Sequence, residues 1–433
     1  MGIFDMSIPS ARISALLIVL GLWASYGHAQ ATDIPARLSL ADSIRLAIER
    51  NPILAAAKNE IRASEGDKVA ADRRFNPTFS LQFEDLPLSP NPGPFFSVQE
   101  ITSRVDYEIE MGGRRQLRTE AANQALEAQI LLYKNQVRLL RLQVQQAFYQ
   151  TVLAKSCLET SQSILDQSER MIQLNQVRFR QGDISALDLN RIEVEKLKFQ
   201  DDVFQADLAL RNAKSSLLAL LNGPDLSQDI EVEGALQINL QDPEPGLPPS
   251  IPVEELIQIA LKQRPDLRAR LQAGKQADTE LRLQRSIRSP SITVGGGYKR
   301  NLYENSVVFG ISIPLKIFNR NEGGIIRAEA EHARSSNLAA ALRNEIQLDV
   351  QKAFNAVEIN RQRVEYIRTR QLKKVEDARR VTLESYNLGG STLIDLLDAQ
   401  RTYRDTLRIF NQALFEERIS LFELSTSIAL GVQ

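Results

Sequence analysis

Apolar residues recur at alternating steps of four and three positions along two long segments of this chain. In the first segment they are Leu126, Ile130, Tyr133, Val137, Leu140, Val144, Ala147, Thr151, Ala154 and Cys157. In the second they are Leu342, Ile346, Val350, Ala353 and Val357. This spacing is typical of a coiled-coil seam. It predicts one helix over about 113–180 and another over about 322–388, each roughly 100 Å long at about 1.5 Å per residue.

Each predicted long helix is followed by a glycine and then by a shorter return helix. Gly182 and Gly389 interrupt the helices, as glycine does where a turn needs positive φ. Ser185 and Thr392 follow them as N-caps of the return helices. The chain should therefore contain two long helical hairpins, over residues 113–222 and 322–430.

The two hairpins belong to an internal duplication, which is the main organising feature of the sequence. Residues 179–189 and 386–396 share an aromatic residue, a glycine, a hydroxyl residue, an aspartate and a leucine at one spacing. Residues 47–52 match 260–265, and 76–79 match 289–292, in the same order along the chain. We divide the chain into a signal peptide (1–30), a first structural repeat (31–223), a Pro-rich linker (224–251) and a second structural repeat (252–433).

Two strand-like segments precede the long hairpin in each repeat, within residues 76–110 and 290–315. Alternation is clearest in Val307, Phe309, Ile311 and Ile313, which are separated by polar or small residues. Turn-forming residues fill the gaps, notably the proline-rich run at 89–94. The sequence thus predicts two short helices and two strands before the long hairpin of each repeat. The whole chain should contain four strands.

The N-terminus has the form of a secretory signal. Arg12 precedes an apolar stretch from Ile13 to Ala24, and small residues suited to cleavage follow. The alternative interpretation is an uncleaved membrane anchor. Cys157 is the only cysteine, which excludes an internal disulfide and a lipid anchor at the mature N-terminus.

Charge and hydropathy argue against two kinds of protein, those that bind nucleic acid and those with transmembrane helices. The 53 basic and 54 acidic residues nearly balance, which argues against a nucleic-acid-binding surface. No run of about 18 apolar residues occurs after residue 30, so no transmembrane helix is expected in the mature chain. If this chain crosses a membrane, it must do so as a closed β-barrel, because backbone polar groups in lipid must be paired.

Candidate catalytic and metal-binding residues are scarce. His332 and Cys157 are the only histidine and cysteine beyond the signal, whereas transition-metal sites need clustered imidazole or thiolate ligands. Gly295, Gly296 and Gly297 lack the Lys-Ser/Thr of a phosphate loop and lie in a strand pattern. We therefore expect no enzymatic activity, no cofactor and no metal site in this chain.

Two repeats of short helices, strand pair and long hairpin resemble the TolC family of outer-membrane efflux channels. The segments 294–301, 310–315, 318–321 and 110–115 resemble the branch typified by CzcC, which serves RND-type heavy-metal exporters. The resemblance implies a mainly α fold with a transmembrane β-barrel portion. Three copies would each give four strands to a twelve-stranded barrel, and the hairpins would form an α-barrel tunnel in the periplasm.

The same resemblance implies the function and the partners. The chain would be a homotrimeric, passive exit duct that lies in the outer membrane and extends into the periplasm. Its cargo would be heavy-metal cations such as Co, Zn, Cd or Cu. It would meet a periplasmic membrane-fusion adaptor and, through it, an inner-membrane RND pump. Outer-membrane lipid would surround the barrel, with aromatic side chains at its borders: Phe75, Phe79, Phe83, Tyr107, Tyr298, Tyr303 and Phe309.

The glycine turns would form the inner tip of the tunnel, and the resemblance assigns the site residues there. The adaptor-contacting turns hold Gly182, Asp183, Gly389, Gly390 and Ser391. The pore and gate residues at the tip are Asp188, Tyr386, Asp395 and Asp398. In a three-fold assembly an inward aspartate becomes a ring that selects cations. The alternative is that these aspartates only favour the helix starts near which they lie.

One position departs from the family pattern. A drug-exporting member has an arginine two residues after the second tip glycine, where it pairs with such aspartates, and this chain has Ser391. The resemblance therefore does not extend to that pairing.

Other functions remain open on sequence alone. The cargo could instead be drugs or a polypeptide secreted by a type I system. A periplasmic adaptor would carry one hairpin inserted into a β-domain, and a soluble coiled-coil scaffold would lack the strand pairs. Both fit the two equivalent repeats less well than a channel does.

Overall fold

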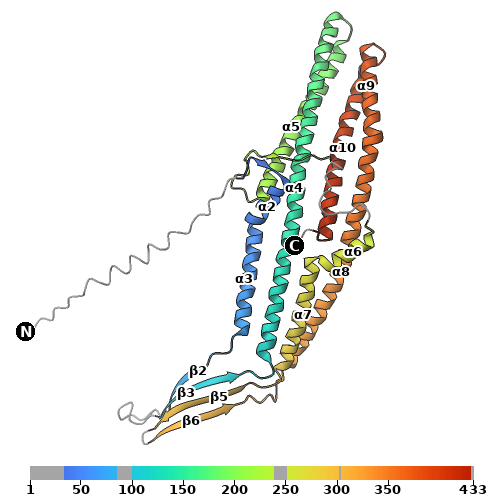
Figure 1. The fold of residues 1–433 in the computed structure, drawn as a ribbon. Coiled ribbons are helices and arrows are strands. Elements are labelled where there is room, and N and C mark those ends of the chain that lie inside the picture. The colour runs from blue at the N-terminus through green and yellow to red at the C-terminus, as the bar shows by residue number, and fades with distance from the viewer. Residues whose placement is uncertain (1–33, 85–99, 238–250, 302–303, 431–433) are drawn as a thin grey trace, which may run out of the picture.

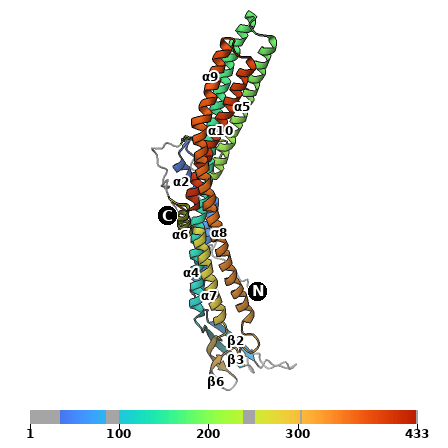
Figure 2. The same ribbon diagram turned by 90° about the vertical axis from the view of Figure 1, so that its right-hand side faces the viewer.

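The computed structural model describes residues 34–84, 100–237, 251–301 and 304–430. Over these residues the molecule is long and narrow, with a β-sheet at one end and the turns of two helical hairpins at the other (Figure 1, Figure 2). The expected signal peptide, Tyr303, the turn at 89–94 and residues 238–250 of the expected linker lie outside the described residues.

Two pairs of shorter helices precede the sheet strands. Pro52 occupies the first turn of its helix, where its missing N–H leaves no hydrogen bond unmade. The Asn51 side chain caps the same helix by accepting hydrogen bonds from the backbone N–H groups of Ile53 and Leu54, at 2.9 and 3.3 Å. Pro265 occupies the equivalent position in the second repeat. The four helices are α2 (Leu40–Arg50), α3 (Pro52–Asp72), α6 (Val253–Gln263) and α7 (Pro265–Ser286).

The two hairpins lie side by side over the upper half of the molecule (Figure 1, Figure 2). The first consists of α4 (Arg114–Gln181) and α5 (Ala186–Leu220). The second consists of α8 (Glu322–Tyr366), the π-helix η2 (Ile367–Leu372), α9 (Lys373–Asn387) and α10 (Leu393–Ser427). The return helices α5 and α10 have the same length of 35 residues.

The π-helical turn η2 interrupts what the sequence predicted as one α-helix over 322–388. Val364 and Ile367 are buried in the main core, and Leu372 packs against the same core. The step from Ile367 to Leu372 is five residues, which an α-helical turn of 3.6 residues does not bring to one face. A π turn, with its i→i+5 hydrogen bonds, brings both side chains to the core.

The coiled-coil seam is also less regular than the spacing suggested. Leu140, Val144 and Ala154 are buried, as are Ile346 and Val350 on α8. Near the start of α4, however, the predicted seam residue Ile130 is 37% exposed and Ala128 is buried in its place. In this region α4 packs against α3 and α7. These two helices contact a different face of α4 from the face that the return helix contacts.

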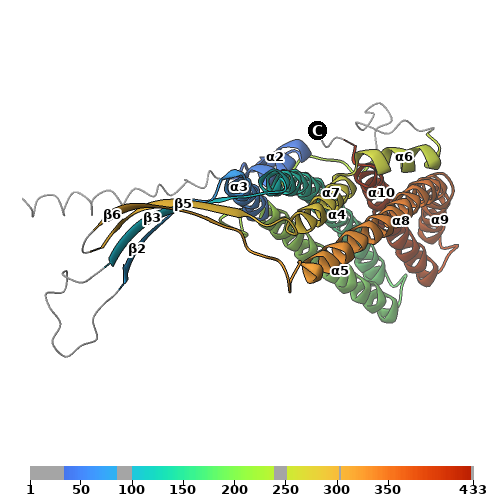
Figure 3. The same ribbon diagram turned by 90° about the horizontal axis from the view of Figure 1, so that it is seen from below.

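Four strands form one antiparallel sheet in the order β2-β3-β5-β6. The central contact, between β3 and β5, joins the two repeats, with Val105 opposite Gly296. Seen from below, the sheet is curved and extends to one side of the helices (Figure 3). The strands are β2 (Thr78–Glu84), β3 (Glu100–Ile109), β5 (Ile292–Arg300) and β6 (Asn305–Ser312).

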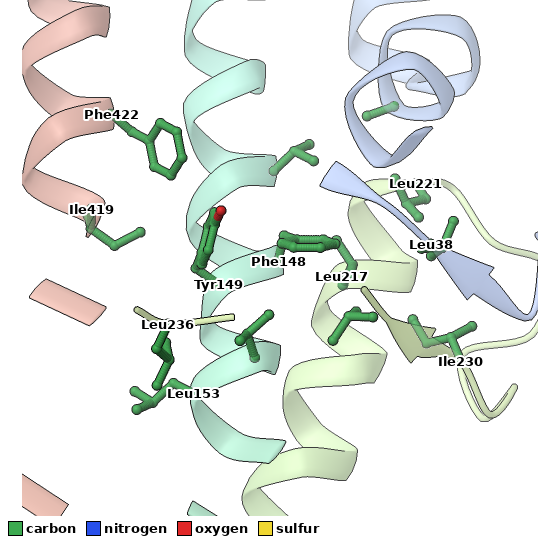
Figure 4. Close-up of a cluster of buried hydrophobic side chains, with 14 of the residues drawn as sticks. Leu38, Phe148, Tyr149, Leu153, Leu217, Leu221, Ile230, Leu236, Ile419 and Phe422 are labelled. Carbon is green, nitrogen blue, oxygen red and sulfur yellow. The ribbon is translucent and has the colours of Figure 1, made fainter. Parts of the chain in front are cut away.

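The main apolar core lies midway along the molecule, where α2, α4, α5 and α10 meet (Figure 4). Phe148 is 1% exposed, and its ring makes an edge contact with Tyr149 at 5.5 Å between centroids. A small parallel pairing of β1 (Arg37–Leu38) with β4 (Glu231–Val232) covers this core on the α5 side. Strands of two residues are too short to show a hydrophobic period, and these two were not predicted.

A buried charged cluster joins both repeats just below that core. Arg264 pairs with Asp266 at 2.6 Å and with Asp349 at 3.0 Å. Arg138, from α4, lies 3.6 Å from Asp266 and donates a 2.7 Å hydrogen bond to the carbonyl oxygen of Thr426, at the end of α10. Because buried charges are tolerated only when paired, this cluster fixes how α4, α7, α8 and α10 meet.

Candidate functional site

The two glycine turns form the end of the molecule furthest from the sheet (Figure 1). Gly182 and Gly389 have φ of 84° and 79°, in the left-handed region. The N–H of Asp183 donates to the carbonyl oxygen of Arg178 at 2.9 Å, and the N–H of Gly390 donates to that of Ser385 at 2.8 Å. No atom lies within 4 Å of a Cβ added at either left-handed glycine, so the backbone conformation alone favours glycine there.

The two equivalent aspartates cap the return helices. Ser185 Oγ accepts a hydrogen bond from the N–H of Asp188 and donates one to its carboxylate at 2.8 Å. Thr392 and Asp395 form a complete capping box, with the N–H of Thr392 donating to the carboxylate at 3.0 Å. Hydrogen bonds from Thr392 hold the pKa of Asp395 below its usual value of 3.8. Both carboxylates therefore stabilise helix starts within the single chain.

Asp398 differs from these two aspartates. It is exposed, lies one turn further along α10, and accepts no hydrogen bond from any described residue. It interacts electrostatically with Arg401, whose pKa is raised mainly by its hydrogen bond to Glu195 and to a smaller extent by Asp398. In the first repeat the equivalent position is Arg191, which pairs with Asp188 at 3.5 Å. Only the second tip thus presents an exposed, uncapping carboxylate at this level among the described residues.

Tyr386 is buried between the hairpins in the single chain. Its side chain is within a cluster formed by both hairpins, and its hydroxyl donates a 2.6 Å hydrogen bond to the Asn175 amide oxygen. The Arg178 guanidinium lies 5.2 Å from its ring centroid. Tyr386 therefore ties α9 to α4 just below the turns. The adjacent Leu388 is 89% exposed at the turn, and sequence reasoning had not singled it out.

A second set of contacts between the hairpins lies further below the turns. Arg401 on α10 donates two hydrogen bonds to the Glu195 carboxylate on α5, the longer at 2.7 Å. The Glu195 side chain is only 2% exposed, and Lys198 also pairs with it at 3.3 Å. Arg401 holds the pKa of Glu195 below its usual value. Arg404 pairs with Asp202 at 3.1 Å one to two turns away.

These contacts were missed from the sequence. Glu195 and Arg401 are 206 residues apart in the chain, and each lies among other charged residues that are solvated on helix surfaces. No local spacing distinguishes them. The pairing follows only once the two return helices are known to lie side by side.

A cleft of about 330 Å³ opens between α4, α5 and α10 beside the Asp202–Arg404 pair. Cys157 lies at its wall with partial exposure, and burial raises the pKa of its thiol. The sequence interpretation of Cys157 as a seam residue agrees with its packing against the main core. Within the described residues, no group of three or more His, Cys, Asp or Glu side chains is arranged to hold a metal ion.

The sheet at the opposite end has two unlike faces. Register places Gln82, Thr102 and Lys299 on one face, together with Arg104, Asp106 and Glu108. The other face is apolar and largely exposed, with Phe309 at 84% and Phe79 at 67%. It carries Phe79, Leu81, Phe83, Val105, Tyr107, Tyr298, Val307, Phe309 and Ile311.

The described helices include none that is both long enough and apolar enough to cross a membrane. The exposed apolar surface is concentrated instead on one face of the sheet and on the outward faces of the long helices.

Comparison with known proteins agrees with this architecture. The chain is 27% identical over 372 residues to the cobalt-zinc-cadmium resistance protein CzcC of Cupriavidus metallidurans, covering 84% of each chain. Among solved structures, CusC superposes with a TM-score of 0.78 at 18% identity, over 90% of this chain and 91% of that one. The outer membrane protein VceC of Vibrio cholerae gives a TM-score of 0.75 at 17% identity, over 91% and 97% of the two chains.

The family model described as outer membrane efflux protein matches this chain twice, over residues 43–223 and 256–426. These two segments contain both hairpins and both strand pairs. The TolC-like resemblance of the sequence is thereby confirmed, and the chain belongs to the family of outer membrane efflux proteins.

Proposed function

We propose that three copies of this chain form the outer-membrane exit duct of a tripartite efflux system. The observation that carries the proposal is the sheet, which has one polar face, one exposed apolar face, and two strands, β2 and β6, with a neighbour on one side only. Joined edge to edge, three such sheets close into a twelve-stranded barrel with its apolar face toward lipid and its polar face toward a lumen.

The aromatic residues expected at the lipid borders support this orientation. Phe79, Phe83, Tyr107, Tyr298 and Phe309 all occupy the apolar face by register. The helical hairpins then extend into the periplasm as the tunnel. A signal peptide over residues 1–30 would direct export.

The cargo we propose is heavy-metal cations. The support is the similarity to a cobalt-zinc-cadmium resistance protein along most of both chains. The metal would pass through the duct without tight ligation, and selection among metals would lie in the inner-membrane RND pump and its adaptor. A duct for drugs or for a secreted polypeptide is the second candidate, since related channels share the fold.

The tip turns are the proposed contact with the periplasmic adaptor. The turns at Gly182–Asp183 and at Gly389–Ser391 are the outermost backbone of the hairpins, and the exposed Leu388 adds an apolar side chain to this surface. Tyr386 would act on the gate indirectly, by holding α9 against α4.

Among the tip aspartates, Asp398 is the strongest candidate for a cation-selecting ring, because its carboxylate is not used in capping. Asp188 and Asp395 would contribute charge to the same region while holding their helix starts. Asp398→Asn should lower the cation preference of the channel in a planar bilayer without loosening the turn. An unchanged reversal potential in this variant would remove Asp398 from the gate.

A deletion strain tests the function as a whole. We expect the strain to become more sensitive to cobalt, zinc and cadmium than to drugs, and the complementing protein to fractionate with the outer membrane as a heat-modifiable trimer. Increased drug sensitivity with unchanged metal tolerance would reassign the cargo. A protein that stays soluble would reject the channel altogether.

A further inference from the structure

Arg104 lies in the middle of β3, on the polar face of the sheet. Its Nε donates a 2.6 Å hydrogen bond to the carboxylate of Asp106, two residues along the same strand. Residues two apart in a strand share a face, so the pair lies along the wall rather than across strands. Both side chains are largely covered, at 29% and 26% exposure. The cover comes from the sheet itself.

Glycines on β5, which neighbours β3, and on β6, the next strand beyond it, make room for this arginine. A Cβ added at Gly310 would lie 2.8 Å from Arg104 Nη2 and 3.1 Å from Nη1. A Cβ added at Gly295 would lie 2.8 Å from Nε and from Nη2, and would also collide with the Asp106 carboxylate. The guanidinium therefore extends over β5 and β6, into space that any other residue at these positions would fill.

Glycines at these positions lower the stability of the sheet. Glycine weakens a strand, because it loses more conformational freedom on folding and offers no side chain to pack. β5 nevertheless has three glycines in succession, of which Gly296 faces the opposite, apolar side, where an added Cβ would lie 3.2 Å from the Phe309 ring. Glycine in a strand commonly marks the close approach of another group, and at 295 and 310 that group is Arg104.

We propose that Gly295 and Gly310 are specificity-determining positions of the duct, because they hold the Arg104 charge against the barrel wall and beside Asp106. This inference rests on the proposed trimeric barrel with its polar face toward the lumen. The pair then contributes a compensated charge to the wall. A side chain at either glycine would push the three guanidinium groups of the trimer toward the axis, where they oppose cations.

The charges of the same face explain why the position of Arg104 matters more than its presence. Among the described strand residues, the carboxylates Glu84, Glu100, Asp106 and Glu108 share the polar face with only two cations, Arg104 and Lys299. Lys299 is paired with Glu100. With both cations held at the wall by carboxylates, the lumen keeps an acidic balance, which favours cation passage.

The test uses the full-length channel in planar bilayers, with potassium chloride at unequal concentrations on the two sides. The three heavy atoms nearest to a Cβ at Gly310 all belong to the Arg104 guanidinium, so Gly310→Ala should lower the cation-over-anion permeability ratio several-fold and reduce single-channel conductance. In an Arg104→Ser background the same glycine substitution should have no effect, because the group it displaces is gone. Such non-additivity is the signature of a direct contact.

Gly296→Ala is the matched control, since it adds the same methyl group in the same sheet but on the apolar face. It should leave permeability unchanged. If Gly310→Ala does not give trimers, Gly295→Ala presses on the same pair from the neighbouring strand and replaces it.

The outcomes separate the inference from the function on which it rests. If the wild-type protein forms no conducting channel, the proposed function fails and the inference fails with it. If the wild type conducts with cation preference and the Gly310 or Gly295 variant behaves identically, only the inference is overturned. An equal effect of the glycine substitution with and without Arg104 would also overturn it.

Discussion

Glu195 is an almost fully covered carboxylate between the two hairpins, and Arg401 is the group that makes it tolerable there. Removing the charge leaves the arginine without its partner and leaves donors aimed at a weaker acceptor. We expect Glu195→Gln to lower the free energy of unfolding by about 1–3 kcal/mol, a range typical of hydrogen bonds to charged groups. Denaturant unfolding of the detergent-solubilised protein, followed by circular dichroism, measures the difference.

Glu193→Gln is the control, because this side chain is exposed on the same helix and the substitution removes the same charge. It should change stability little. An equal loss in both variants would mean that net charge on α5, rather than the Arg401 contact, is responsible.

The Glu195–Arg401 pair makes the folding stability depend on pH. Arg401 lowers the pKa of Glu195 below its ordinary value of 4.5. The unfolded state therefore takes up the proton first as pH falls, and the stabilisation is present above about pH 4.5 and is lost below it, through the folded-state pKa. The stability difference between wild type and Glu195→Gln should shrink over that acidic range. A difference that stays constant down to pH 3 would contradict this assignment.

Tyr386 permits a cleaner substitution near the turns. Tyr386→Phe removes only the hydroxyl that bonds to Asn175 at 2.6 Å, and it leaves the amide oxygen of Asn175 without that donor in a buried setting. We expect a loss of about 1 kcal/mol in unfolding free energy. Tyr403→Phe, on the neighbouring helix, has no such hydroxyl contact among the described residues and should be close to neutral.

The sequence reveals the site residues unevenly, and the reason is the range of their contacts. Gly182, Gly389 and their capping partners are local features, because each turn is specified within about ten residues. Tyr386 lies just below the turns, but its burial depends on Asn175, 211 residues away. Asp395 could be interpreted as a capping residue or as a pore residue, and its spacing from Thr392 decides the first role only.

At the scale of elements, the long hairpins and strands were predictable because each has its own hydrophobic period. All four strands lie within the segments 76–110 and 290–315 that the sequence pattern predicted. The order β2-β3-β5-β6 was not predictable, since pairing of β3 with β5 depends on how the two repeats meet. The η2 turn was missed for a related reason: the five-residue step from Ile367 to Leu372 has meaning only against the core that both contact.

The five-residue step across η2 predicts the effect of deleting one residue there. Removing Thr369, which is exposed within the π turn, shortens the step between Ile367 and Leu372 to four residues. A continuous α-helix then presents both side chains to the core, so the protein should still fold and assemble. Trimer formation on a semi-native gel and helix content by circular dichroism are the measurements.

Removing Arg343, exposed within regular α8, is the matched control. This deletion turns the following helix by about 100° relative to its neighbours and moves Ile346 and Val350 away from their core. It should prevent assembly. If both deletions are tolerated equally, the π turn has no special relation to the core.

At the scale of the whole molecule, one apolar surface has no partner within the described chain. α5 exposes side chains on the face opposite its packing against α4, at intervals of seven, three, seven and four residues. They are Leu187, Val194, Leu197, Phe204 and Leu208, each more than half exposed. This is a coiled-coil spacing, and a patch of this kind on a soluble surface marks an interface. In the proposed trimer its partner is the neighbouring subunit.

Charged substitutions on that face should therefore separate assembly from folding. Leu197→Glu with Phe204→Glu removes little packing inside the single chain, because these residues are 68% and 63% exposed. We expect helix content to be retained while trimers are lost, as judged by light scattering of the detergent-solubilised protein after size-exclusion chromatography. Leu197→Met with Phe204→Met keeps the surface apolar at the same positions and should keep the trimer. A charged variant that remains trimeric would place the subunit contact on another face and would remove the α5 seam from the assembly.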